Sequence, residues 1–226
     1  MSPINSAVHF TAAYSSASAE LSAKCAWSLD HVFTTECPSL THPDETDRRV
    51  RVHPAQSESV LAVSRDGGET WEVGNEGLSS LDVHGLTVVP GETKTLVAAT
   101  NNDVCITTDL INWTPLKVRE HFPWPYCRSA LYLSASSNRV YVGAGNGPPG
   151  DQGGLFYTSD LGATWERADF GGNANSTIWA VVHNPAVSDW IMAYSVSGEV
   201  YRSTNNGDSW NKLDREFGEV RALAIV

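Results

Sequence analysis

Short runs of apolar and β-branched residues alternate with polar turns from about residue 48 to the end of the chain. One group of four runs reads HGLTVVP from His84, TLVAAT from Thr95, VCITTD from Val104 and WTPL from Trp113. Each run is short, and Gly, Asn or Pro marks its ends, as is typical of β-strands joined by turns. Helical periodicity is not sustained in any stretch of the sequence. The pattern therefore predicts an all-β protein whose strands come in groups of four.

A short box recurs around the turn between the third and fourth run of these groups. It has the pattern S/T-x-D/N-x-G-x-T/S-W, and one copy, TTDLINW, is a residue shorter and lacks the glycine. The steps between the equivalent residues Asp66, Asp109, Asp160 and Asn205 are 43, 51 and 45 residues. That period fits one four-stranded blade of a β-propeller. The boxes occupy residues 64–71, 107–113, 158–165 and 203–210.

The residue types of the box predict a turn that holds two strands together. An Asp side chain can accept hydrogen bonds from backbone N–H groups of its own turn, and Gly accepts a positive φ. The Trp then opens the fourth strand with a large apolar surface to bury.

This pattern resembles the Asp-box (BNR, bacterial neuraminidase-type) repeat of β-propellers, and the resemblance covers about residues 48–226. It implies an all-β Asp-box propeller of about four to five blades. The superfamily includes sialidases, xyloglucanases, sortilin-type receptors and photosystem assembly factors. The resemblance therefore implies a fold and not a reaction.

The order of the strands predicts a propeller that is incomplete or closes irregularly. Residues 1–23 are rich in Ser and Ala and predict a disordered tail, whereas residues 24–226 form the propeller. First strands are expected to start at residues 48, 84, 128, 179 and 221. The blade from residue 48 is one strand short, and EVRALAIV from Glu219 begins a further blade. Closure is expected from pairing of the terminal strand, from a homodimer through open propeller edges, or not at all.

Composition narrows the partners. The 226 residues are 41% hydrophobic and 18% charged, which allows a sizeable core, and the formal net charge is −11. That charge repels phosphate backbones and anionic lipid headgroups, so we expect no nucleic-acid and no membrane partner. The sequence contains neither a stretch of 18 apolar residues nor a recognisable signal peptide, which predicts a soluble, cytoplasmic protein.

Metal and redox chemistry gain no support from the sequence. Cys25, Cys37, Cys105 and Cys127 form no C-x-x-C pair, and the seven histidines show no ligand spacing within one element. We expect no metal and no cofactor. Reduced structural thiols are the favoured interpretation, and a Cys25–Cys37 disulfide is the alternative.

Two long insertions point to one face of the propeller. KVREHFPWPY from Lys117 joins two blades, and GAGNGPPGDQGG from Gly143 joins a second strand to a third. Both connections belong to the face where inner strands begin, while the boxes belong to the opposite face. Insertions gathered on one face are typical of a binding surface, although drift in solvent loops is the alternative. A β-strand follows Gly143 to Gly147, so these glycines predict a flexible loop and not a phosphate loop.

The inner-strand starts and the FPWPY loop supply the candidate binding residues. Guanidinium groups suit bidentate recognition of a carboxylate or phosphate, and Trp179 offers a face for a sugar ring or a cation. An alternative is that the arginines form structural salt bridges with Asp82 and Glu219. The predicted site consists of Arg48, His84, Trp124, Tyr126, Arg128, Trp179 and Arg221.

These residues predict a non-catalytic recognition or scaffold propeller. Its expected ligand is an anionic small molecule, a glycan or an acidic protein segment. The cluster is also similar to the arginines with which sialidases hold a substrate carboxylate, so a sialidase-like exo-glycosidase is the alternative. That resemblance implies a tyrosine nucleophile with a glutamate partner and an aspartate acid. Tyr126 lies on the expected face, but no glutamate can be assigned to it and the F-R-I-P signature is missing around Arg48. Enzyme activity is therefore not the favoured prediction.

Overall fold

The structure, a computed structural model, describes residues 49–55, 58–64, 70–133, 138–187 and 189–225. The predicted tail, the Cys25–Cys37 pair, Arg48 and most of the first box lie outside the described residues. Strands dominate the described chain, and its helical elements are the 3-10 turns η1 (Val118–Glu120) and η2 (Pro185–Val187).

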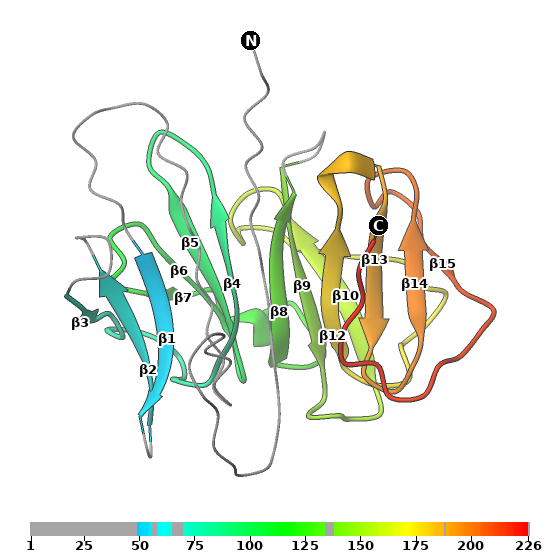
Figure 1. Cartoon of the computed structure of the whole chain (residues 1–226), viewed down its shortest axis with the longest axis horizontal. Helices are drawn as coiled ribbons and strands as arrows, with labels where there is room; N and C mark the ends of the chain where they lie inside the picture. The colour runs from blue at the N-terminus through cyan, green and yellow to red at the C-terminus, as the bar shows by residue number, and fades with distance from the viewer. Residues whose placement is uncertain (1–48, 56–57, 65–69, 134–137, 188, 226) are drawn as a thin grey trace, which may run out of the picture.

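Four antiparallel sheets follow one another along the chain and lie side by side (Figure 1). Each four-stranded sheet has its strands in chain order, as expected for a propeller blade. The first sheet contains β1 (Arg49–Ala55), β2 (Glu58–Ser64) and β3 (Glu72–Val73). The second contains β4 (Val83–Val89), β5 (Thr95–Thr100), β6 (Val104–Thr107) and β7 (Thr114–Pro115). The third contains β8 (Tyr126–Leu133), β9 (Arg139–Gly145), β10 (Gly153–Thr158) and β11 (Glu166–Arg167). The fourth contains β12 (Ile178–His183), β13 (Ile191–Ser195), β14 (Val200–Ser203) and β15 (Asn211–Lys212). The described residues thus form four blades of an all-β propeller.

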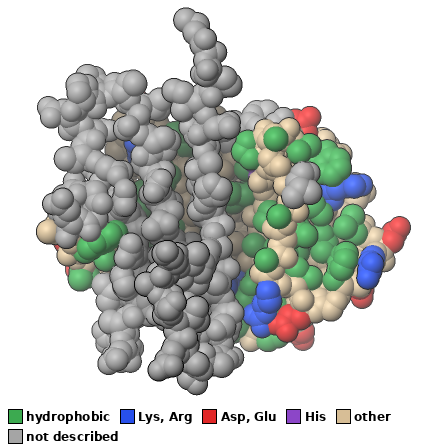
Figure 2. All heavy atoms as spheres, in the orientation of Figure 1, with side chains coloured by type: hydrophobic (Ala, Val, Ile, Leu, Met, Phe, Trp, Pro, Cys, Tyr) green, Lys and Arg blue, Asp and Glu red, His purple; other side chains and the backbone are tan. Residues whose placement is uncertain are grey.

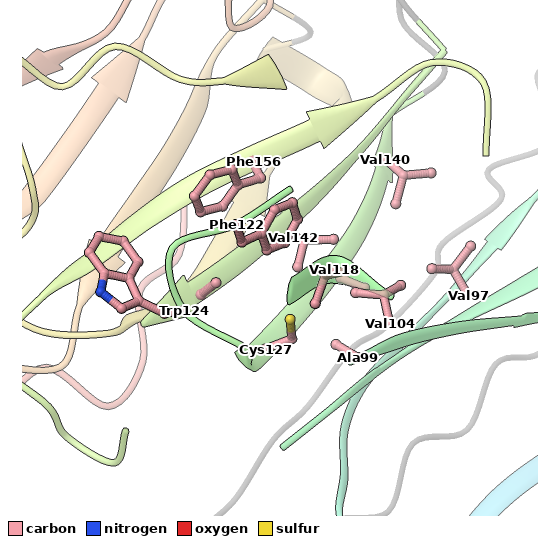
Figure 3. Close-up of a cluster of buried hydrophobic side chains, with 12 residues drawn as sticks. Val97, Ala99, Val104, Val118, Phe122, Trp124, Cys127, Val140, Val142 and Phe156 are labelled. Carbon is pink, nitrogen blue, oxygen red and sulfur yellow. The ribbon is translucent and has the colours of Figure 1, made fainter. Parts of the chain in front are cut away.

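The core lies between neighbouring blades. Successive residues of a strand point to opposite faces, so Leu96 and Ala98 of β5 join the cluster shared with the first blade, while Val97 and Ala99 join the cluster shared with the third. Figure 3 shows this second cluster, which contains Val97 of β5 together with Val140 and Val142 of β9. Burial on both faces explains why β5 reads as a continuous apolar run rather than an alternating one.

The fourth blade also carries apolar side chains on both of its faces. A third cluster joins Tyr141 and Leu155 of the third blade to Ile178 and Ile191 of the fourth. In Figure 2, the described surface in the region of β12 to β14 is also rich in apolar side chains, with charged groups toward its margin. Among the described residues, no further sheet packs on that side.

The boxes form the predicted turns. In the third blade, the Asp160 carboxylate accepts hydrogen bonds from Thr164 N (2.9 Å), Thr164 Oγ1 (2.7 Å) and Thr158 Oγ1 (2.7 Å). Asp109 accepts bonds from two backbone N–H groups of its shorter turn, and Asn205 Oδ1 accepts from Ser209 N (3.0 Å). Each box therefore fixes the connection between the third and fourth strand of its blade.

Among the described residues, the first blade lacks its inner strand. Ser64 of β2 directly precedes the first box, as Thr107 of β6 precedes the second. Arg49 pairs with Ser64 as Leu96 pairs with Thr107, so β1 and β2 occupy the places of β5 and β6. The described residues hold three strands of this blade, as predicted, but the strand predicted to be missing was the third, and the alignment of residue 48 with a first strand was wrong. Because RVRVHP and LTVVP carry the same apolar pattern, their sequences could not distinguish a first strand from a second.

The predicted first strand from Arg221 is not formed among the described residues. Residues 221–225 make no ladder with another strand, although Asn184 Nδ2 donates to Ile225 O at 2.9 Å. An inner strand forms its ladder with the second strand of its own blade, and the described residues contain no such partner for this segment.

Backbone conformation separates the full boxes from the shortened one. Leu161 and Gly162 adopt φ of 57° and 93°, and Asn206 and Gly207 adopt 57° and 87° in the equivalent turn. The shortened box passes through this region with Leu110 alone, at φ 71°. Asn tolerates the left-handed region better than Leu because its short polar side chain can hydrogen-bond locally.

We expect Leu161→Asn to raise the free energy of unfolding by about 1 kcal/mol, because it relieves a left-handed leucine whose side chain is partly exposed. Urea denaturation measures the change. The reverse substitution in the next box, Asn206→Leu, should lower stability by a similar amount. Equal stability of all three proteins would contradict the argument.

The box carboxylate also predicts an acid-sensitive contribution to stability. Hydrogen bonds from Thr164 and Thr158 lower the pKa of Asp160 from 3.8 to about 2. A carboxyl group whose pKa falls on folding stabilises the native state above its unfolded pKa. This contribution is lost as the pH falls from about 3.8 through 2. The difference in unfolding free energy between the natural chain and Asp160→Asn should therefore shrink over that range in urea titrations. Asn205→Asp should give the next box the same dependence, and a difference independent of pH would refute the assignment.

Candidate functional site

A pocket of about 730 Å³ lies where the inner strands β4, β8 and β12 begin. It receives Tyr126 from the end of one predicted insertion and Pro148 and Pro149 from the other, so both insertions reach the same face. A smaller cavity of about 220 Å³ adjoins it along the inner strands and shares His84, Arg128, Trp179 and Arg221. The larger pocket is lined by Asp82, His84, Tyr126, Arg128, Pro148, Pro149, Trp179, Val196, Ser197, Gly218, Glu219 and Arg221.

A β-bulge places three of the predicted residues at this pocket. The ladder register shifts between Val83 and Gly85, between Cys127 and Ser129, and between Ile178 and Ala180. The extra residue in each case is His84, Arg128 or Trp179. A bulge bends its strand and re-aims the side chain that it carries, which accounts for three equivalent residues lining one pocket.

Arg128 is a buried cation. Its residue is only 5% exposed, its guanidinium carbon lies 4.2 Å from the centre of the Trp179 ring, and Nη1 donates to His84 O at 3.4 Å. Burial lowers the pKa of Arg128, and the carboxylate of Asp82 acts in the opposite direction. Among the described residues, no carboxylate forms an ion pair with this guanidinium. Most of its N–H donors are therefore not used by the described chain.

Trp179 supports two cations of the chain itself. The guanidinium carbon of Arg221 lies 5.3 Å from the indole centre, and Arg221 also forms an ion pair with Glu219. Both distances fall within the range of cation–π attraction. The indole face that the sequence offered to a sugar ring or a cation thus takes guanidinium groups, which it holds in place.

His84 connects the pocket wall to the strand behind it. Its Nδ1 lies 2.9 Å from Cys127 O, and its Nε2 lies 3.2 Å from Asp82 Oδ1. A carbonyl and a carboxylate both accept hydrogen bonds, so each of these two contacts is made by a ring nitrogen that carries a hydrogen. The Tyr126 ring lies 5.0 Å from the imidazole at an angle of 55°.

Gly143 and Gly145 allow close packing of β9. A Cβ on Gly143 would lie 2.6 Å from Ile178 O, so this residue lets β9 approach β12. The turn that follows is hydrogen-bonded throughout, with Asn146 Oδ1 accepting from Asp151 N at 3.0 Å and Thr177 Oγ1 donating to Gly147 O at 2.6 Å. The flexible loop predicted here is instead an anchored turn that presents two prolines to the pocket.

Trp124 does not line the pocket. It is buried in the cluster between the second and third blades, where Phe122 stacks on Phe156 with ring centres 3.9 Å apart (Figure 3). The Arg167 guanidinium lies 5.5 Å from the Trp124 ring. The rings of the aromatic loop are buried in this cluster, so the structure does not bring Trp124 together with the other predicted site residues.

The structure therefore brings together five of the seven predicted residues, and Arg48 lies outside the described chain. Sequence reasoning missed Val196 and Ser197, which join β13 to β14. This connection is of the same kind as the Gly143–Gly154 insertion, so its position in the repeat was the available signal. The five residues at the pocket are His84, Tyr126, Arg128, Trp179 and Arg221.

The described residues contain no group of three His, Cys, Asp or Glu side chains able to hold a metal ion. They also contain no helix long and apolar enough to cross a membrane. Cys105 and Cys127 are buried free thiols, and burial raises the pKa of both.

We expect Arg128→Met to leave the free energy of unfolding unchanged or to raise it by about 1 kcal/mol, because an apolar side chain of similar length avoids burying a charge. Arg139→Met is the matched control. Arg139 donates to Asp208 at 3.0 Å and stabilises the fold, so this substitution should lower the free energy of unfolding. Urea denaturation compares the two. A loss above about 2 kcal/mol for Arg128→Met would mark this arginine as a structural residue.

The comparisons with known proteins agree with this fold. The BNR/Asp-box repeat family model matches residues 62–73. An ancestral GH74 enzyme is similar in structure, with 21% identity and a TM-score of 0.56 over 76% of this chain and 23% of its own. The Niastella koreensis GH74 enzyme gives 19% identity and a TM-score of 0.56, over 75% and 28%. The extracellular domain of BT4673 from B. thetaiotaomicron gives 13% identity and a TM-score of 0.53, over 78% and 23%.

The chain thus spans about a quarter of the length of these three solved structures. A comparison with curated protein sequences gave no significant match. Identities this low establish the architecture and leave the chemistry open. The chain thus contains a BNR/Asp-box repeat at residues 62–73 and has the four-stranded blades of a β-propeller.

Proposed function

We propose that this propeller is a recognition module that binds an anionic group in the pocket at the start of its inner strands. The observation that carries the proposal is Arg128, a guanidinium 5% exposed that forms no ion pair with a carboxylate among the described residues. Burying a charge without a partner costs free energy, so such an arrangement favours a partner that arrives as ligand.

The geometry around Arg128 suits recognition. The indole of Trp179 restrains the guanidinium, which reduces the side-chain entropy that binding would otherwise cost. A planar guanidinium with unused donors can donate two parallel hydrogen bonds to two oxygens of one anion. The pocket, at about 730 Å³, falls in the size range of small-molecule sites, which also admits a short segment of a protein.

The alternative of purely structural salt bridges describes the neighbouring cations better than it describes Arg128. Arg221 pairs with Glu219, and His84 lies against Asp82. Arg128 instead has an aromatic ring and a backbone carbonyl as its contacts. A positive centre is thereby kept at the pocket of a chain whose formal net charge is −11.

The test is a thermal melt of the purified chain with a panel of anionic sugars, nucleotides and acidic peptides. A ligand that binds the native state raises the midpoint, and at 100 times its Kd it contributes about 2.7 kcal/mol. We expect one class of anion to raise the midpoint and Arg128→Met to abolish that shift. Arg202→Met is the matched control, because Arg202 lies 5.3 Å from the Trp190 ring and lines neither cavity.

An undiminished shift in the Arg128→Met protein would contradict the proposal, as would loss of the shift in both variants. Hydrolysis of a fluorogenic sialoside that Tyr126→Phe abolishes would instead establish the exo-glycosidase alternative.

A further inference from the structure

The first blade has an open edge at β1. This strand occupies the place of a second strand, and among the described residues no strand pairs with its other edge. In the three complete blades, the inner strand fills that place and comes directly before the second strand in the chain. A strand edge without a ladder partner presents backbone N–H and C=O groups for pairing, so it favours the addition of a further strand.

The ladders of the three complete blades share one spacing between the inner strand and the second strand. In each blade, the residue that pairs with the first residue of the box lies twelve positions after the bulge residue. These bulge and second-strand residues are His84 and Leu96, Arg128 and Val140, and Trp179 and Ile191. In the first blade, Arg49 pairs with Ser64, the first residue of the box. The same spacing therefore assigns the bulge position of this blade to Cys37.

The connection that leads to β1 agrees with this register. Pro90 and Pro185 each stand six positions before the second-strand residue that pairs with the box, and Pro43 stands six positions before Arg49. The four residues PDET that begin at Pro43 also resemble PGET at Pro90. The chain before Arg49 thus has the length and the turn residues of an inner strand followed by its connection.

The sequence before Pro43 also has the polar pattern that a terminal blade requires. Among the described residues, no sheet precedes the first one along the chain. In the second blade, Leu86 and Leu96 belong to the cluster shared with the first blade. Their register places in the first blade are taken by Ser39 and Arg49. Polar residues at these places suit a face in contact with water, as in the terminal repeats of other repeat proteins.

We propose that residues 36–42 pair with β1 as the inner strand of the first blade. Cys37 then takes the register place that His84, Arg128 and Trp179 hold in the other blades, and all three of these residues line the pocket. The first blade thereby contributes a thiol to the pocket. This inference holds for any ligand and does not depend on the proposed function.

The other candidate for this edge is the terminal segment 221–225, which makes no ladder with a described strand. Within one chain, the C-terminus and β1 lie at opposite ends of the row of sheets (Figure 1). A second copy of the chain could supply the segment instead. The experiment therefore compares both segments as partners of β1.

The ladder of the second blade identifies which residues should face each other. Leu86 pairs with Ala98, and the same register places in the first blade are Ser39 and Arg51. We therefore expect the double variant Ser39→Cys, Arg51→Cys to form an intramolecular disulfide under mild oxidation. The full chain is used, with its two cysteines before β1 replaced by Ser. Mass spectrometry of tryptic peptides identifies the bond.

Two further pairs serve as controls. Leu40→Cys, Arg51→Cys shifts the register by one residue, and adjacent residues of a strand face opposite sides of the sheet. This pair should form at least roughly fivefold less disulfide. Leu223→Cys, Arg51→Cys tests the terminal segment, because Leu223 has the register place there that Ser39 has in residues 36–42.

A second measurement tests the position of Cys37. In the Cys25→Ser chain, Tyr126→Cys places a thiol at the pocket, and a short bis-maleimide should join it to the natural Cys37. Trp190→Cys is the control, because Trp190 is exposed and lines neither cavity. That variant should give no such link.

The outcomes distinguish the two segments. A disulfide between positions 223 and 51, within one chain or between two copies, would assign the edge to the terminal segment and overturn the proposal. Equal trapping in the register control would also overturn it, as would absence of a disulfide from every pair in variants that unfold cooperatively. A bis-maleimide link as strong from Trp190→Cys as from Tyr126→Cys would remove Cys37 from the pocket.

Discussion

The site depends on a bulge repeated at one position of three inner strands. His84, Arg128 and Trp179 each occupy the extra residue of a shifted ladder. A regular strand sends alternate side chains into the two blade interfaces, where apolar residues fill the space. The bulge takes one residue out of that alternation without displacing the packed residues around it. Polar side chains can therefore line the pocket while Val83, Cys127 and Ile178 beside them remain buried.

Much of the fold could be predicted because the determinants of an Asp-box blade are local. Asp160 forms hydrogen bonds with groups within four residues of itself, so the box can be recognised from eight consecutive residues. The face of the pocket followed from the order of strands in a blade, which fixes where each connection lies. Packing between distant segments could not be predicted from the sequence in the same way. Trp124 entered a core built by residues of two other segments, and the roles of β1 and β2 depended on a register that their apolar pattern shares with other strands.

The site was predictable as a set of positions and not as a set of contacts. Alignment of the repeats identified the inner-strand starts, since equivalent residues of successive blades meet around one axis. It could not show that Trp179 holds Arg128, or that His84 contacts the Cys127 carbonyl. Those contacts join different blades, and no sequence spacing encodes the distance between them.

Packing favours apolar residues in the inner strands, whereas the pocket contains charged ones. The two ends of each blade meet these requirements separately. The box ends of the blades keep similar residues because each turn must satisfy the same backbone groups. The opposite ends differ from blade to blade, with an imidazole, a guanidinium and an indole at one equivalent position. Arg128 illustrates the consequence, because its burial opposes its charge while the neighbouring indole stabilises it. A cation held in this way contributes little to folding, which agrees with the binding role proposed for it.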